Sequence, residues 1–118
     1  MAKYERNFTG DFDDFLYYIE SSILKGSLSA HIEDGSDYRN GTFRCSFRVF
    51  ERYSMLGKNR VSLSVALIGQ QDSLFLSAIA AGGSQAVLFK INTFGEEFFL
   101  DTLVSAVEKY IKKETTNF

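Results

Sequence analysis

The sequence contains a single histidine, His31, and histidine is the side chain that most often transfers protons in catalysis near neutral pH. Ser29 and Ser46 are predicted on the same sheet face as His31, so a serine, histidine and aspartate arrangement can be drawn. The 118 residues contain no Gly-x-Ser-x-Gly segment, however, and no local pattern typical of an oxyanion hole. We therefore predict a non-enzymatic protein without catalytic residues. An enzyme that uses His31 with nearby arginines is the less favoured alternative.

Three arginines, Arg44, Arg48 and Arg52, recur every four residues along one predicted strand. Together they could clamp an anion, but four residues of strand span about 13 Å at about 3.3 Å per residue. That spacing exceeds the Debye length of about 8 Å at physiological salt, so the three charges do not act as one. We expect each arginine to pair with Glu33 or Glu51, or to be solvated.

The only cysteine, Cys45, cannot form a disulfide within the chain. It falls on the predicted core face between Phe43 and Phe47, where burial makes a thiol an unreactive small hydrophobe with a raised pKa. One cysteine and one histidine are too few ligands for a structural zinc site. We predict no metal and no cofactor.

The overall composition is that of an ordinary soluble domain, with 45% hydrophobic residues and a net charge of -2. Nucleic-acid binding usually needs a basic surface, so we predict no nucleic-acid partner. No window reaches the roughly 18 apolar residues of a membrane helix, and the charged start does not resemble a signal peptide. We expect a cytoplasmic protein without a membrane partner. Residues 1–118 are predicted as one domain, with 1–8 and 114–118 flexible.

Hydrophobic periodicity predicts the elements that position these side chains. A helix over 11–25 has Asp11 as its N-cap and Gly26 after its last turn. A second helix begins at Thr93, in a Thr-x-x-Glu capping box, and ends near Lys113. Between the helices, a turn over 34–37 follows the first of five strands, which are predicted over 27–33, 42–53, 60–68, 73–80 and 85–92.

This order predicts an α+β two-layer sandwich, in which a five-stranded antiparallel meander carries an N-terminal and a C-terminal helix on one face (α-β-β-β-β-β-α). The alternation assigns the core face to one set of residues: Leu28, Ala30, Ile32, Phe43, Cys45, Phe47, Val49, Val61, Leu63, Val65 and Leu67. The other face is left open. It is predicted to grade from polar to apolar through His31, Arg44, Arg48, Phe50, Arg52, Phe75, Ile79 and Leu88.

An apolar centre with a polar rim is typical of protein interfaces. We therefore predict a binding or assembly module that forms a homodimer through the open sheet face or through the edge strands. The alternative is a small-molecule binder that holds an apolar ligand between the sheet and the C-terminal helix.

Five segments are similar to those of a known family: Lys3-Tyr4-Glu5-Arg6, Glu51-Arg52-Tyr53-Ser54, 59–63, 82–87 and 90–97. Together they resemble a small family of bacterial proteins classed as a domain of unknown function, and the resemblance covers nearly the whole chain. It implies a bacterial, stand-alone cytoplasmic protein. It brings no activity, cofactor or catalytic residue.

Overall fold

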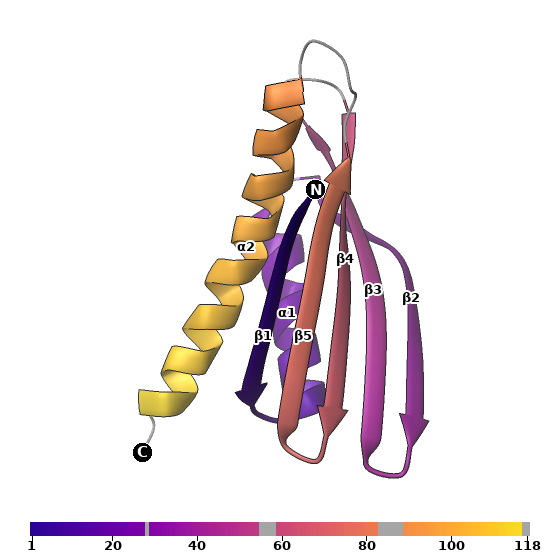
Figure 1. Cartoon of the computed structure of the whole chain (residues 1–118), viewed down its shortest axis with the longest axis vertical. Coiled ribbons are helices and arrows are strands. Elements are labelled where there is room, and N and C mark those ends of the chain that lie inside the picture. The colour runs from indigo at the N-terminus through magenta and orange to yellow at the C-terminus, as the bar shows by residue number, and fades with distance from the viewer. Residues whose placement is uncertain (28, 55–58, 83–88, 117–118) are drawn as a thin grey trace.

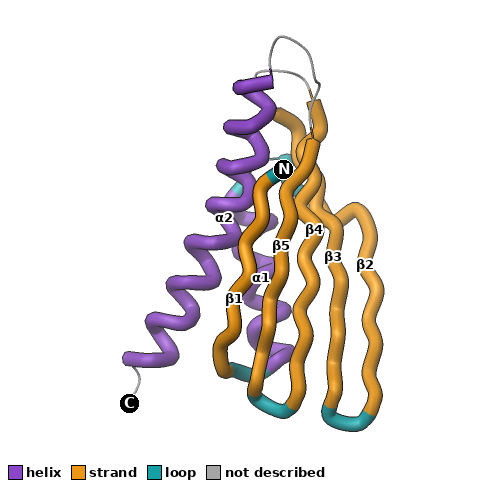
Figure 2. Tube along the Cα trace, viewed as in Figure 1, coloured by secondary structure: helices purple, strands orange, loops and turns teal. Residues whose placement is uncertain are grey.

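Five strands and two helices make up the computed structural model, which describes residues 1–27, 29–54, 59–82 and 89–116. The elements are β1 (Ala2–Thr9), α1 (Phe12–Gly26), β2 (His31–Asn40), β3 (Phe43–Ser54), β4 (Asn59–Gln70), β5 (Ser73–Gly82) and α2 (Phe89–Thr116) (Figure 1). The strands form one antiparallel sheet in the order β1-β5-β4-β3-β2, with the chain from β2 to β5 as a meander (Figure 2). The predicted two-layer α+β architecture is confirmed.

Helix α1 forms where the periodicity predicts it. The Asp11 side chain accepts a hydrogen bond from the Asp14 backbone N–H at 2.9 Å and so caps the helix. Acidic Asp13 and Asp14 lie in the first turn and Lys25 in the last, which suits the helix dipole. The buried stripe consists of Phe12, Phe15, Ile19 and Ile23.

Both helices pack on the same face of the sheet. Buried residues of α1, of α2 and of one face of β3, β4 and β5 belong to a single hydrophobic cluster. In Figure 1, α1 lies behind the strands and α2 runs beside β1. Phe15, Leu63 and Phe99 are fully buried at the centre of this layer. The predicted placement of both helices on one face is therefore confirmed.

The fifth strand comes from the opposite end of the chain to the one predicted. Residues 83–88 lie outside the described residues, but 89–92 form the first turn of α2 and not the end of a strand. The fifth strand is β1, over residues that we expected to be flexible, and it pairs with β5. Because its partner lies about 70 positions later, local periodicity carries no signal for this pairing. Thr93 lies inside α2 and so does not cap it.

Strand β2 runs through residues 34–37, where we predicted a turn. A β-bulge between Ile32 and Asp34 shifts its register against β3. Gly35 lies within the strand and not in a turn. Glycine is favoured there because a Cβ at this position would lie 2.9 Å from Cδ of Arg48 on the neighbouring strand. The turn itself follows at Gly41, whose φ of 62° favours glycine.

Strand β3 presents the opposite face to the helices from the one predicted. Phe50 is fully buried, while Phe43 and Phe47 lie on the uncovered side and are exposed. Arg44, Arg48 and Arg52 share the side of Phe50. The predicted faces of β3 assume that arginine side chains point to solvent. That assumption fails here, because α1 supplies carboxylates that pair with Arg44 and Arg48.

Candidate functional site

The uncovered side of the sheet is the main candidate for a binding surface. Paired residues in an antiparallel sheet project to the same side, so the register defines which residues lie there. We call this surface the open face. Its central part consists of Lys3, Glu5 and Asn7 of β1, Phe75, Ser77 and Ile79 of β5, Ser64, Ala66 and Ile68 of β4, Phe43, Cys45, Phe47 and Val49 of β3, and Asp34, Ser36 and Tyr38 of β2.

Large apolar side chains gather on β3 and β5 of the open face, and Tyr38 of β2 lies beside them. The exposed fraction is 52% for Phe47, 56% for Tyr38 and 39% for Ile79. The Tyr38 ring lies edge-on to Phe43, with 6.2 Å between the ring centroids. Charged and polar residues such as Lys3, Glu5 and Asp34 lie on the two outer strands. An apolar centre with a polar rim therefore exists on this face, and it includes the predicted Phe75 and Ile79.

A shallow groove of about 210 Å³ crosses the open face between β3 and β5. Small residues of β4, Ser64 and Ala66, form its floor, and Phe47 and Ile79 stand on either side. The exposed Phe47 ring thus lies beside a groove that is large enough to hold an aromatic side chain.

Cys45 is buried, as predicted, but on the open face and outside the hydrophobic core cluster. Its neighbours across the ladder are Tyr38 and Ile68. Burial raises the pKa of the Cys45 thiol, which lowers its reactivity.

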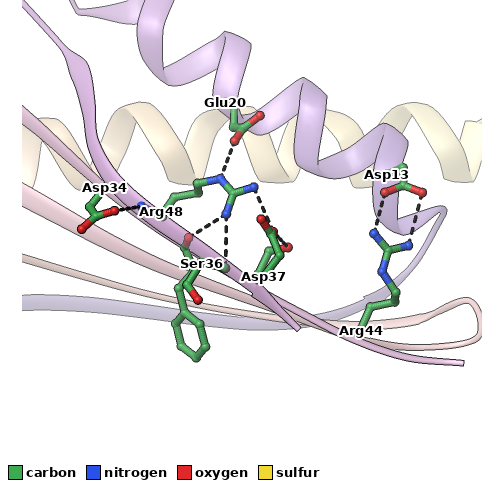
Figure 3. Close-up of polar contacts among 10 residues, drawn as sticks. Asp13, Glu20, Asp34, Ser36, Asp37, Arg44 and Arg48 are labelled. Carbon is green, nitrogen blue, oxygen red and sulfur yellow. Dashed lines mark hydrogen bonds and ion pairs between the residues drawn. The ribbon is translucent and has the colours of Figure 1, made fainter. Parts of the chain in front are cut away.

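Arg48 lies between the sheet and α1, at the centre of an ion-pair network (Figure 3). Its Nε donates to Glu20 at 2.7 Å, and its Nη2 donates to Asp37 at 3.0 Å. Its Nη1 donates to the backbone carbonyls of Phe47 and Ser36. All three guanidinium nitrogens of Arg48 therefore donate hydrogen bonds within the fold.

Arg44 makes a second bridge to the same helix. Its guanidinium donates to both carboxylate oxygens of Asp13, at 2.8 and 3.3 Å (Figure 3). It also stacks 4.4 Å from the Phe12 ring centroid. The Arg44 guanidinium holds the pKa of the Asp13 carboxyl below its usual value. The Ser46 hydroxyl and then Arg48 do the same for the pKa of Asp37.

Arg52 is the most buried of the three arginines. It donates to the Ser27 hydroxyl at 3.1 Å and lies 4.8 Å above the Phe99 ring, and its burial lowers its pKa. The structure therefore uses all three arginines, and Phe50 with them, inside the helix–sheet layer. The predicted open-face position of these four residues is therefore wrong. Arg44 and Arg48 pair with carboxylates of α1 and β2, and not with the predicted Glu33 or Glu51.

One signal in the sequence could have revealed this placement. Asp13 and Glu20 are seven residues apart and so lie on one side of α1, about 10 Å apart along its axis at 1.5 Å per residue. Arg44 and Arg48 repeat at a similar distance along β3. Matching spacing of opposite charges on two elements predicts that those elements face each other.

His31 lies at one corner of the open face, beside residues that sequence reasoning did not bring together. Its Nε2 is 3.0 Å from Glu33, and its Nδ1 is 3.3 Å from the Ser29 carbonyl. Arg60 reaches Glu51 at 2.8 Å and Glu33 at 3.8 Å. The arginines that we expected near His31 lie on the other sheet face, so the alternative enzyme site is not assembled.

The same corner contains a donor set suited to a metal ion. Single ligand atoms of His31, Glu33 and Glu51 all lie within 4.8 Å of one another. The Arg60 guanidinium sits against both carboxylates, where it supplies the positive charge that a cation would bring. This corner is therefore an ion-pair cluster in the structure.

A cleft of about 460 Å³ lies at the far end of the layer, between β1 and the last turns of α2. Phe8 and Ile111 form apolar parts of its wall, and Arg6 and Glu114 are charged parts. Arg6 also pairs with Glu108 at 3.0 Å. Leu88, the remaining predicted site residue, lies outside the described residues.

The fold and site define a two-layer α+β protein with an apolar, helix-free sheet face. Within the described ranges, neither helix is long and apolar enough to cross a lipid bilayer. The chain belongs to a family of unknown function, DUF6054, whose family model matches residues 1–111. No curated protein and no solved structure matches it significantly.

Proposed function

We propose that this protein is a non-enzymatic assembly module that forms a homodimer by packing two open faces together. The observation that carries the proposal is the group of exposed apolar residues on the helix-free sheet face, of which Phe47 and Tyr38 are more than half exposed. Contiguous apolar surface rimmed by polar residues is characteristic of protein interaction sites.

The size of the open face is sufficient for a stable dimer. Strands about 4.8 Å apart and residues about 3.4 Å apart make a face of about 24 Å by about 27 Å for five strands and eight residues. Each copy would then bury about 500 to 650 Å², depending on how many strands overlap, which gives more than about 1,000 Å² for the pair. Sheets that pack face to face with aligned strands are a common arrangement.

The edge strand β2 is less suitable for association than the face. Exposed β2 carries Glu33, Asp37 and Arg39, and a bulge interrupts it after Ile32. Charges and bulges are the usual means by which proteins block pairing at a sheet edge. We therefore assign self-association to the open face.

Light scattering coupled to gel filtration tests this function. The wild-type protein is expected at about twice the 13.3 kDa mass of one chain. Phe47→Asp should shift it to the monomer, because a carboxylate would be desolvated in the contact. Tyr17→Asp is the matched control, since Tyr17 is an exposed aromatic residue on α1, away from the open face. A wild-type monomer at high concentration contradicts the proposal.

The cleft between β1 and α2 supports a second candidate function, the binding of a small apolar molecule. The layer between the sheet and α2 is filled by residues such as Phe99, Leu103 and Val107, which are fully buried. The cleft at its end, with Phe8 and Ile111 in its wall, is where such a ligand would fit. Native mass spectrometry of the purified protein should then detect a co-purified mass, which Ile111→Glu removes.

A further inference from the structure

We propose that the two-fold axis of the dimer runs parallel to the strands, between β3 and β4, so that Phe47 of each copy fits the groove of the other. This geometry rests on the proposed function, since it requires that two open faces meet. In this geometry, the partner of the open face is the open face of a second copy of the same chain.

The axis follows from the position of the groove relative to the aromatic ring. Rotation about this axis lays β3 over the partner's β4, and β2 over the partner's β5. Phe47 then lies above the partner's Ala66, which is on the groove floor. Because the operation is two-fold, the same contact forms twice, and each protruding ring fills a depression lined by small residues.

A row is the set of residues that lie side by side across the strands in the register of the sheet. The rows next to that of Phe47 are also complementary under this rotation. Val49 lies above the partner's Ser64, and Tyr38 lies above the partner's Phe75. A large side chain meets a small one in the first pair, and two aromatic rings meet in the second.

Charges at the outer strands support the same axis. The register places Lys3 beside Ile79 on β1, and Asp34 beside Val49 on β2, in one row of the sheet. The rotation brings Asp34 over the partner's Ile79, so it is offset sideways from the partner's Lys3 by one strand spacing of about 4.8 Å, across the roughly 10 Å between facing sheets. Among the residues that the structure describes, neither Lys3 nor Asp34 has an ion-pair partner within its own chain.

An axis perpendicular to the strands that crosses β3 between Cys45 and Phe47 gives a poorer fit. It reverses the order of the rows, so Phe47 meets the region of the partner's Cys45, between two further phenylalanines. Lys3 then lies near the partner's Thr9, and Asp34 near the partner's Asn40, so no opposite charges meet. The parallel axis is therefore the one that the surface favours.

Charge exchange tests the axis separately from the dimer. Lys3→Glu alone and Asp34→Lys alone should each weaken dimerisation by about fivefold in sedimentation equilibrium, because each change affects two equivalent pairs. The double variant restores both pairs with their signs exchanged and should dimerise within about twofold of wild type. If wild type dimerises but the double variant is no stronger than the singles, the axis is wrong and the proposed function stands. If wild type is monomeric, the proposed function fails.

Cysteine cross-linking gives an independent measurement of the same axis. In a Cys45→Ala background, Lys3→Cys protein is mixed with Asp34→Cys protein and treated with a short bismaleimide. The mixture should yield cross-linked dimers, whereas Lys3→Cys mixed with Thr9→Cys should yield none. Cross-linking in the second mixture and not in the first would overturn the parallel axis in favour of the perpendicular one.

Discussion

Two parts of the layer between helices and sheet are built from different chemistry. On β4 from Val61 to Leu67, and on β5 from Leu74 to Ala80, the helix-facing residues are apolar and almost completely buried. On β3, three helix-facing residues are arginines, and two of them, Arg44 and Arg48, pair with carboxylates of α1. A sheet face can therefore be covered by a helix whether it is apolar or charged, provided that the helix carries the complementary pattern.

The charged part is also more enclosed than an ordinary surface pair. The Arg48 and Glu20 side chains are 15% and 23% exposed, while those of Arg6 and Glu108, at the β1 side of the layer, are 40% and 45% exposed. Partial burial strengthens an ion pair and also makes it costly to leave one partner alone. The Arg48–Glu20 pair should therefore contribute more to the free energy of unfolding than the Arg6–Glu108 pair.

The largest effect is expected from the apolar residue that interrupts the arginines of β3. Phe50→Ala should lower the free energy of unfolding by about 3–5 kcal/mol, because it leaves a cavity in the core. Phe47, on the opposite face of the same strand, is the matched control, and Phe47→Ala should change monomer stability by less than about 1 kcal/mol. Urea denaturation at low protein concentration measures both. Equal losses would mean that the two faces of β3 are not distinct.

A smaller but substantial effect is expected from Arg48. Arg48→Met leaves the carboxylates of Glu20 and Asp37 without their cation, and should lower the free energy of unfolding by about 2 kcal/mol. Arg6→Met, in the more exposed pair, should lower it much less, because solvent screens that pair. A second change, Glu20→Gln, should recover part of the loss in the Arg48 variant. The difference between the two arginines would vanish if burial did not strengthen the inner pair.

The distinction between the two parts also explains what the sequence could predict. The apolar face of β4 and the stripe of α1 were predicted correctly, because burial there leaves a regular hydrophobic period. The face of β3 was not, because arginine on a covered strand and arginine in solvent give the same alternation. Strand β1 was missed for another reason, since its pairing with β5 depends on a contact far along the chain. The groove beside Phe47 required the correct face of β3 and so could not be predicted either.

Tyr4 provides a spectroscopic test on the β1 side of the layer. Its hydroxyl donates to Glu108, and burial together with this contact raises the pKa of Tyr4 to about 12. Because the pKa is above the ordinary value of about 10, the stabilisation is complete below pH 10 and is lost as the pH rises towards 12. A titration at 295 nm should show a tyrosine that ionises near pH 12. Tyr4→Phe should remove that transition, with a loss of about 1 kcal/mol from the missing hydrogen bond. A titration curve in which Tyr4→Phe removes a transition near pH 10 would contradict this assignment.

The smallest effect is expected from Asp37, the more exposed carboxylate that pairs with Arg48. The Ser46 hydroxyl, at 2.5 Å, and Arg48 hold the pKa of Asp37 below its ordinary value. A lowered pKa means that the stabilisation is present above about pH 4 and is lost as the pH falls through the lower, folded value. Asp37→Asn should therefore flatten the loss of stability between pH 5 and pH 2, by less than about 1 kcal/mol, since this carboxylate is largely exposed.

Ser46→Ala separates this interpretation from a general effect of net charge. It keeps the charge of Asp37 but removes the hydrogen bond that contributes most to the lowered pKa. The acid dependence should therefore become shallower in Ser46→Ala as well, and Asp37→Asn added to it should have little further effect. If the two changes were additive, Asp37 would respond to the charge of the whole protein and not to its partners on β3. The charged part of the layer would then differ from the apolar part in composition alone.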